Sequence, residues 1–212
     1  MTYLLIVLSY VLGSIPSSYI IGKVFHDIDL REHGSGNLGA TNAFRVLGAR
    51  SAIPVISVDV LKGFIPIVLF PTIASVGFGW ILAFGAAAIV GHMFSVWVAF
   101  SGGKGMATAA GVFLGIAPWA VLVGLIVWCG VTFSTGYVSL GSIVTAFALP
   151  FLVAFTPHQG GLTLVWFSVA IGSFVIWAHR GNVKRLFRGE EHRFGTRSRG
   201  VSENGEEPES VA

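Results

Sequence analysis

The sequence predicts an all-α protein, a polytopic membrane helical bundle. Two compositional observations indicate this: 54% of the 212 residues are hydrophobic and only 11% are charged, against about 25% charged residues in average soluble domains. A soluble domain of this size could not cover so much apolar surface with so few charges. The apolar residues also fall into runs that approach the length of about 20 residues required to cross a bilayer.

Seven apolar segments follow one another along the chain. We expect the first to be a retained span, because residues 1–12 lack the basic n-region and cleavage site of a signal peptide. The segments are 3–21, 52–73, 77–100, 106–116, 119–133, 138–155 and 162–178. They predict one membrane domain over residues 1–199 with seven transmembrane helices, some of them short. Residues 200–212 are acidic and polar, and we expect a disordered tail there.

Residues 106–133 could form one long helix or two short ones. A single straight helix would be about 42 Å long, whereas the hydrocarbon core is about 30 Å thick. Pro118 lacks a backbone donor and disfavours helix in the residue before it. We therefore favour a break at Gly115–Pro118.

Basic residues predict the orientation, since short cytoplasmic loops of membrane proteins are enriched in Lys and Arg. They occur in the 23–50 loop, in the turn around Lys104 and after residue 178, whereas the connections on the other side contain none. Seven spans with the N-terminus outside place all three regions, and the C-terminus, on the cytoplasmic side. Six spans would put the loop and the tail on opposite sides.

The sequence contains no pattern typical of a metal site or of a redox-active site. The lone Cys129 excludes an intrachain disulfide and a site built from several cysteines. The six histidines are scattered, and neither a Gly-x-Ser-x-Gly nor a Cys-x-x-Cys pattern is present. We expect no metal and no other cofactor.

A glycine-rich run at residues 33–42, followed by Arg45, indicates a phosphate-binding loop. Glycine lets backbone amides approach an anion closely, and successive amides can form an anion-binding nest. A helix that starts at Ala40 would present its N-terminus to the same anion, and the Arg45 guanidinium suits phosphate oxygens. The alternative is a merely flexible cytoplasmic loop.

A second run, residues 101–105, places Lys104 among glycines just before an apolar helix. Free amides and a cation at a helix N-terminus again favour phosphate. The alternative is that Lys104 only marks the cytoplasmic side. His92, near the end of the preceding apolar segment, is either a structural hydrogen-bond partner or part of the site.

Other polar residues fall within or next to apolar segments. Asp59 and Lys62 share one helix face, and such charges are costly in a membrane, so they form either a structural pair or a substrate-facing pair. Ser142 serves either helix packing or the site. His179 and Asn182 are three residues apart and could reach the same site as the two glycine-rich runs.

Taken together and in order, these runs resemble the PlsY family, the acyl-phosphate:glycerol-3-phosphate acyltransferases of bacterial inner membranes. The resemblance covers roughly residues 12–193. The matching pieces are Gly13–Pro16 with Lys23; Gly34–Asn42 with Arg45; Gly91-His92 with Phe100 and Gly102–Thr108; and His179-Arg180 with Asn182, Arg185, Gly189 and Glu191. One departure is Gly181, where family members usually carry a larger polar residue.

The resemblance implies acyl transfer from a long-chain acyl phosphate to the 1-hydroxyl of glycerol 3-phosphate. This gives lysophosphatidic acid and phosphate, the first step of phospholipid synthesis, without a metal or other cofactor. It implies a seven-helix bundle in the bacterial inner membrane, with the site facing the cytoplasm. The partners would be the two substrates, membrane lipids and an upstream enzyme that makes acyl phosphate; no nucleic acid is expected. A transporter of a phosphate ester is the alternative.

The resemblance also assigns residues. Catalytic roles fall to Ser35, Arg45, Lys104, Ser142, His179 and Asn182. Substrate contacts fall to Gly36, Asn37, Gly39, Ala40, Thr41, Asn42, His92, Gly102, Gly103 and Glu191. We expect the Ser35–Thr41 loop to hold the phosphate of the acyl donor. Lys104, Arg45 and the Gly102 and Gly103 amides would bind glycerol 3-phosphate, and substrate phosphate, or else His179, would take the proton.

Overall fold

The computed structural model describes residues 1–194, so the predicted tail at 200–212 lies outside the described residues. Within that range the chain is all-helical and contains no strand. The helices are α1 Thr2–Ser14, α2 Ser17–His26, α3 Ala40–Leu47, α4 Ala49–Ala74, α5 Phe78–Met93, the 3₁₀ helix η1 Val96–Val98, α6 Met106–Ile116, α7 Pro118–Thr135, α8 Val138–Phe155, α9 Gly161–Ala178 and α10 Arg180–Arg188. The predicted all-α architecture is confirmed.

The helices differ in whether they are long enough to cross a bilayer. By length and composition, five described helices qualify: α4, α5 with η1, α7, α8 and α9. A sixth span results if α1 and α2, which are bent by 41° relative to one another, count as one. Helix α6 is apolar but has only 11 residues.

The first and third predicted segments each contain a break in the helix that the sequence analysis did not predict. Helix α1 ends at Ser14 and α2 begins at Ser17, because Pro16 lacks a donor and restricts Ile15 to extended backbone. Helix α5 ends at Met93, and the chain then turns through η1 with left-handed backbone at Ala99 and Phe100. Both interruptions lie inside what the hydropathy pattern presents as uniform spans.

The break before Pro118 is confirmed. Helix α6 ends at Ile116, Ala117 has φ −148° and ψ 64°, and α7 begins at Pro118. Proline suits the first position of a helix, where its missing N–H would have no intrahelical partner.

Glycines allow two pairs of helices to pack with their backbones almost in contact. Gly13 and Gly91 bring α1 and α5 together, and Gly63 and Gly111 bring α4 and α6 together; a Cβ at any of the four would overlap backbone atoms of the partner helix. Small residues at crossings serve this purpose in membrane bundles. These contacts fix α6 against α4.

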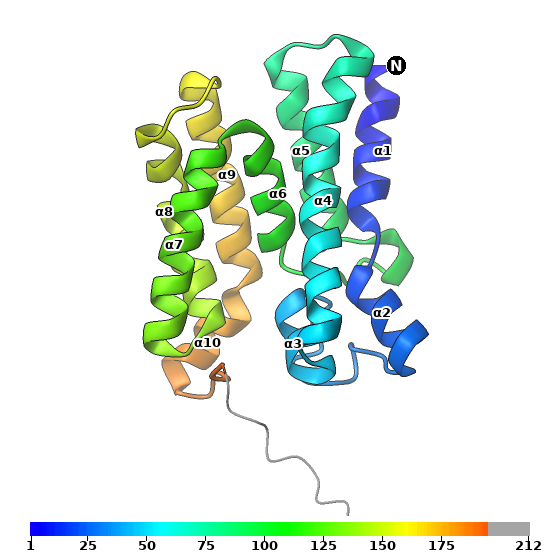
Figure 1. Cartoon of the computed structure of the whole chain (residues 1–212), viewed down its shortest axis with the longest axis vertical. Coiled ribbons are helices and arrows are strands. Elements are labelled where there is room, and N and C mark those ends of the chain that lie inside the picture. Colours follow the sequence, from blue (N-terminus) through cyan, green and yellow to red (C-terminus); the bar gives the residue numbers. More distant parts are fainter. Residues whose placement is uncertain (195–212) are drawn as a thin grey trace, which may run out of the picture.

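Figure 1 shows how this arrangement creates an interior site. Helices α7, α8 and α9 stand on one side, α1, α4 and α5 on the other, and α6 lies between them. Helix α6 occupies only the upper part of the bundle, so its N-terminal end lies inside the molecule. Below it, α3 and α10 face each other from the two sides. The residues just before α6 therefore lie between the two halves of the bundle.

Candidate active site

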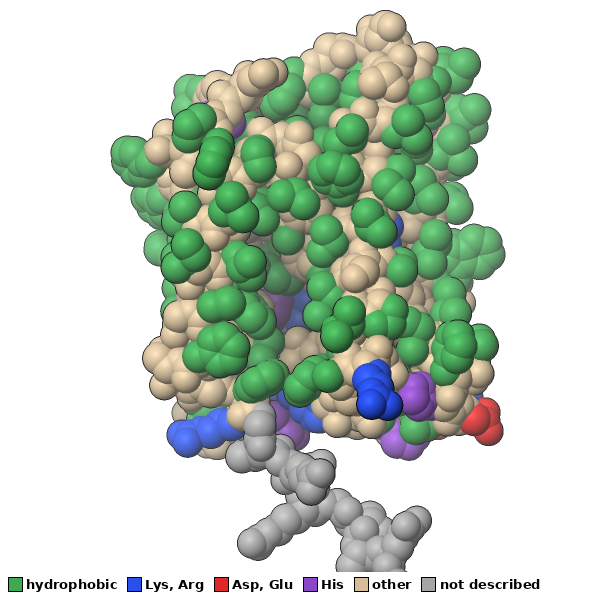
Figure 2. Space-filling model, viewed as in Figure 1, with side chains coloured by type: hydrophobic (Ala, Val, Ile, Leu, Met, Phe, Trp, Pro, Cys, Tyr) green, Lys and Arg blue, Asp and Glu red, His purple; other side chains and the backbone are tan. Residues whose placement is uncertain are grey.

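Three segments converge below α6: the 27–39 loop with α3, the 99–105 turn, and the α9–α10 junction. Figure 2 shows a hollow on this face between the two halves, with basic and histidine side chains visible inside a largely apolar rim. The Lys and Arg side chains on this face gather mostly at the lower end. On this face the basic side chains thus gather at one end of the bundle, with a few more inside the hollow.

The glycine-rich loop is held in shape by Asn42, which is buried at the start of α3. Its Oδ1 accepts a hydrogen bond from the Ser35 amide at 2.8 Å, and its Nδ2 donates to the carbonyls of Leu30 and His33 at 3.1 and 3.0 Å. Gly34 lies directly against the Asn42 side chain, where a Cβ would overlap Oδ1. Asn42 therefore shapes the loop, a role the sequence prediction had not separated from substrate contact.

The loop presents backbone amides toward the N-terminus of α3. Gly34 and Gly36 have φ of 62° and 69°, a conformation that glycine adopts without strain. The α3 hydrogen bonds begin at the Asn42 amide. Among the described residues, the amides of Asn37, Gly39, Ala40 and Thr41 therefore donate to no acceptor, and such groups at a helix N-terminus favour an anion.

The turn before α6 contradicts one prediction. The amides of Gly102 and Gly103 are not available to a substrate, because they donate to the carbonyls of Met93 and His92 at 3.1 and 3.2 Å. Asn37 Nδ2 donates to the Gly102 carbonyl at 3.3 Å and so joins the turn to the glycine-rich loop. The two glycines shape the turn; they do not form an anion nest.

Lys104 is linked to the α9–α10 region by a chain of hydrogen bonds. Its Nζ donates to Asn182 Oδ1, and Asn182 Nδ2 donates to Glu191 Oε1 at 2.8 Å. Glu191 also accepts from Ser139 Oγ at 2.9 Å and from Arg185 Nε at 2.7 Å. The carboxylate thereby ties α8, α10 and the segment after α10 together behind the lysine.

The cations of the site are enclosed, which changes their pKa values. Burial, aided by the charge of nearby Arg185, lowers the pKa of Lys104 to about 8, against the opposing effect of Glu191. Burial also lowers the pKa of Arg45, with Glu191 opposing it. Glu191 remains a carboxylate: burial raises its pKa, but hydrogen bonds from Asn182, Ser139 and Arg185 outweigh this and hold the pKa below its ordinary value. The arrangement leaves positive charge facing the hollow.

His179 lies between α9 and α10 and is almost completely buried. Its Nδ1 lies 2.8 Å from the Val175 carbonyl, and since a carbonyl can only accept, Nδ1 carries the proton. Burial, reinforced by the charge of Lys104, lowers the pKa of His179 to about 4. The imidazole is therefore neutral near pH 7.

Two residues assigned to the site have other partners in the structure. Ser142 accepts from Trp128 Nε1 at 3.2 Å and donates to the Val138 carbonyl at 3.0 Å, which places it in the α7–α8 contact. His92 is buried with Nδ1 3.6 Å from Asp59 Oδ1. Asp59 and Lys62 form an ion pair at 2.7 Å, with side chains 1% and 4% exposed. These contacts favour the structural interpretations of Ser142 and of the Asp59–Lys62 pair.

Ser139 and Arg185 were not assigned roles, although both bind Glu191. Their positions in the sequence gave a usable signal. Ser139 lies three residues before Ser142 on the same helix face, and Arg185 lies three residues after Asn182. Only the folded chain shows that Glu191 meets them.

An apolar pocket lies between α6, α7, α8 and α9. Thr145 is its single polar side chain, and the other lining residues are Met106, Ala109, Ala110, Phe113, Ala120, Val121, Gly124, Ala146, Leu149, Ile171, Gly172 and Val175. Met106 follows Lys104 by two residues, and the Val175 carbonyl contacts His179. The site thus combines an anion-binding end with an apolar end, which suits a molecule with a phosphate head and an acyl chain.

The described residues contain no cluster of His, Cys, Asp and Glu able to hold a metal ion. The groups that converge on the hollow are cations, open amides and one neutral imidazole.

Comparison with known proteins agrees with this arrangement. A family described as glycerol-3-phosphate acyltransferase matches residues 3–189. A glycerol-3-phosphate acyltransferase of Fusobacterium nucleatum is 44% identical over 89% of this chain and 96% of its own length. One from Geotalea daltonii is 43% identical over 90% of this chain and 96% of its own length.

Two solved structures are also similar. The glycerol 3-phosphate form of PlsY, an integral membrane glycerol 3-phosphate acyltransferase, is 38% identical with a TM-score of 0.83, over 92% of this chain and 96% of that one. The lysophosphatidic acid form is 36% identical with a TM-score of 0.81, over 92% and 95%. The chain is therefore a multi-pass membrane protein that belongs to the glycerol-3-phosphate acyltransferase family.

Proposed function

We propose that this chain transfers a fatty acyl group from an acyl phosphate to the 1-hydroxyl of sn-glycerol 3-phosphate, giving lysophosphatidic acid and inorganic phosphate. This reaction is the first step of phospholipid synthesis. The observation that carries the proposal is the Lys104–Asn182–Glu191 chain of hydrogen bonds, which joins two distant motifs of the family beside the glycine-rich loop. The adjoining pocket is lined almost entirely by apolar residues, which suits an acyl chain.

The chemistry requires positioning more than activation. Acyl phosphate is a mixed anhydride, so the substrate hydroxyl can attack the acyl carbon directly; the new ester C–O bond forms, the bond to phosphate breaks, and phosphate leaves. Holding both substrates in line supplies most of the advantage. The 37–41 amides would bind the phosphate of the acyl donor, while Lys104 and Arg45 would bind glycerol 3-phosphate and stabilise developing negative charge. The Gly102 and Gly103 amides do not bind substrate in this proposal, because both donate to backbone carbonyls.

The proton of the attacking hydroxyl goes to substrate phosphate in this proposal. His179 is the rival base, but a pKa near 4 makes it a weak one at neutral pH. The variant His179→Asn retains an amide that can donate to the Val175 carbonyl, so the helix end should be preserved. We expect it to keep measurable turnover. Complete loss of turnover, with folding and substrate binding unchanged, would identify His179 as the base.

We further propose that the chain crosses a bacterial inner membrane seven times, with α6 as a short crossing, the N-terminus outside and the site open to the cytoplasm. The distribution of basic residues supports this. Glycerol 3-phosphate would then reach the site from the cytoplasm, and the acyl chain from the membrane. An upstream enzyme that makes acyl phosphate would supply the donor.

A transporter of a phosphate ester is the remaining candidate. Transporters place polar groups along a path to the far face. Here the pocket beyond Lys104 is lined by apolar residues and a single threonine. The lining of this pocket offers an anion no charged partner, which favours the acyltransferase.

The direct test uses purified protein in detergent with palmitoyl phosphate and glycerol 3-phosphate, following release of phosphate and formation of lysophosphatidic acid. Release should depend on glycerol 3-phosphate and should fall at least about 100-fold in Lys104→Met. Reactions without glycerol 3-phosphate control for spontaneous hydrolysis. Absence of lysophosphatidic acid with well-folded wild-type protein would rule the proposed function out.

A further inference from the structure

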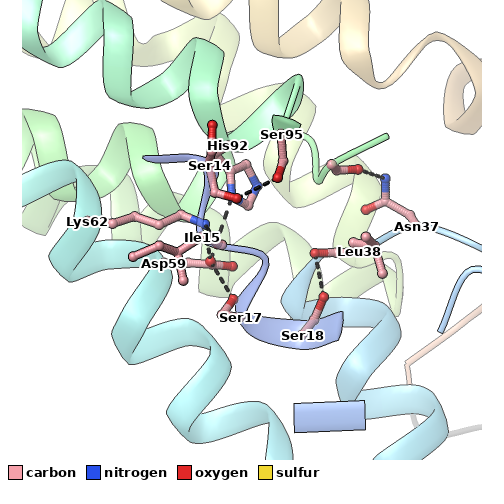
Figure 3. Close-up of polar contacts among 11 residues, drawn as sticks. Ser14, Ile15, Ser17, Ser18, Asn37, Leu38, Asp59, Lys62, His92 and Ser95 are labelled. Atoms are coloured by element: carbon pink, nitrogen blue, oxygen red, sulfur yellow. Dashed lines mark hydrogen bonds and ion pairs between the residues drawn. The ribbon is translucent and has the colours of Figure 1, made fainter. Parts of the chain in front are cut away.

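Asp59, Lys62 and His92 form a buried polar cluster that the proposed mechanism does not use. Their side chains are 1%, 4% and 5% exposed, at a depth where charged groups are costly unless paired. Figure 3 shows the three side chains converging between α4, α5 and the α1–α2 break. Each further contact of the cluster goes to a place where a helix is interrupted.

The first interruption is the α1–α2 break. Asp59 Oδ1 accepts from Ser17 Oγ at 2.7 Å and from Lys62 Nζ at 2.7 Å. Lys62 Nζ also donates to the Ile15 carbonyl at 2.9 Å. The pair on α4 therefore satisfies backbone and side-chain groups that the break at Pro16 leaves without helical partners.

The second interruption is the turn that carries Lys104. The Gly103 amide donates to the His92 carbonyl, and the Gly103 Cα rests against the imidazole, since a Cβ there would overlap His92 Nε2. On the other edge of the ring, Nδ1 lies 3.6 Å from Asp59 Oδ1. The ring thus stands between the carboxylate and the glycine that precedes Lys104.

The turn needs such support because its backbone is strained. Ala99 and Phe100 have φ of 52° and 59°, which non-glycine residues adopt only when their surroundings hold them there. Asn37 holds the turn from the loop side through the Gly102 carbonyl. His92 holds it from the bundle side.

We infer that His92, with Asp59 behind it, is a positioning residue for acyl transfer: the imidazole fixes the Gly102–Gly103 turn and thereby aims Lys104 at the phosphate of glycerol 3-phosphate. This inference rests on the proposed function. It differs from the earlier expectation that His92 contacts substrate. It also differs from a role confined to bundle stability, which the Asp59–Lys62 and Ser17 contacts already serve.

The test compares His92→Leu with His92→Gln. The leucine variant removes the polar ring but leaves the Asp59–Lys62 pair intact, whereas the glutamine amide can occupy the place of Nε2 beside Gly103. We expect His92→Leu to raise the KM for glycerol 3-phosphate about 10- to 100-fold, with the KM for acyl phosphate little changed. His92→Gln should recover most of the loss. The control is His26→Leu. His26 is the last residue of α2 and is hydrogen-bonded to Ser51 in α4, and its loss should leave both KM values as in wild type.

A second measurement reports on the turn without turnover. An amine-directed reagent followed by mass spectrometry should label Lys104 faster in His92→Leu than in wild type, and at the wild-type rate in His26→Leu. Equal labelling and an unchanged KM would overturn the inference, as would loss of thermal stability with both KM values unchanged. Failure of the wild type to turn over would instead overturn the proposed function, and the labelling would still decide the role of His92.

Discussion

Lys104 is the residue on which the site depends most, because it is a cation at the inner end of an apolar bundle. Lys104 is held by a neutral amide, that of Asn182, which in turn binds Glu191. The positive charge of Lys104 is therefore available to an anion. The cost of burying that charge appears as a pKa lowered to about 8. A buried lysine that must stay protonated makes binding sensitive to pH.

The first prediction concerns that sensitivity. Lys104 is charged below its pKa and loses the charge as the pH rises through about 8. The KM for glycerol 3-phosphate should therefore rise above that pH by on the order of tenfold per unit, as measured by initial rates from neutral pH to about pH 10. Lys104→Arg is the matched control, because arginine stays charged over this range and its KM should remain flat. A flat profile in wild type would mean that the Lys104 charge does not bind this substrate.

The second prediction concerns Asn42, which shapes the glycine-rich loop through both ends of its amide. Asn42→Asp keeps an acceptor for the Ser35 amide but puts an oxygen against the Leu30 and His33 carbonyls. We expect turnover to fall at least about tenfold, with a higher KM for acyl phosphate. Thr41→Ser, at the exposed neighbouring position, should change the KM much less. Equal effects of both changes would argue that Asn42 does not shape the loop.

At the scale of helices, close packing on glycine decides where α6 begins, and so where Lys104 lies. Gly63 faces Thr108, and Gly111 faces Val60, so the two glycines interlock α4 with α6. Proline interrupts the chain where α6 gives way to α7. Together these features make α6 a half-length helix whose N-terminal end is interior.

The third prediction follows from that crossing. Gly111→Leu should force α4 and α6 apart, since a Cβ alone already overlaps the Val60 carbonyl. We expect a loss of roughly 2 kcal/mol or more in stability, seen as a lower unfolding temperature in detergent, together with loss of turnover. Gly130→Leu, in α7, where nothing lies within 4 Å of an added Cβ, should leave both unchanged. If the two variants were equally stable, the crossing would not be the constraint proposed.

At the scale of the whole molecule, the two ends of the bundle differ in their content of basic residues. Figure 1 places the N-terminus, the α4–α5 connection and the α8–α9 connection at the upper end, with α3 and α10 at the lower end. The exposed basic residues Arg180, Lys184 and Arg188 belong to α10. The same end carries α3 and α10, which hold Arg45 and Asn182 of the site.

The fourth prediction tests this orientation. In a Cys129→Ala background, cysteine is introduced as Arg188→Cys in α10 or as Gln159→Cys in the α8–α9 connection. A membrane-impermeant thiol reagent applied to inverted inner-membrane vesicles should label position 188, and applied to spheroplasts it should label position 159. The reverse pattern would contradict the proposed orientation. Labelling of both positions from one side would contradict the proposed number of crossings.

The sequence by itself determined the features that depend on local composition. Hydrophobic runs predicted most helices of the bundle, Pro118 predicted the break between α6 and α7, and the glycine-rich run predicted a helix that starts at Ala40, where α3 begins. The family resemblance named Lys104, Asn182 and Glu191 as site residues, and these three side chains are joined by hydrogen bonds in the structure. These features can be predicted from the sequence because hydrophobicity and proline each affect the conformation of residues that are neighbours in the chain.

Only the tertiary structure decided how polar groups share partners. In the folded chain the Gly102 and Gly103 amides donate to backbone carbonyls, although the sequence suggested that they were free to bind an anion. Ser142 accepts a hydrogen bond from Trp128, and Ser139 donates one to Glu191. The tertiary structure also placed His92 between Asp59 and Gly103. Hydrogen bonds between residues far apart in the chain depend on how helices cross, and that depends on packing along their whole length. No local pattern in one sequence records such a crossing.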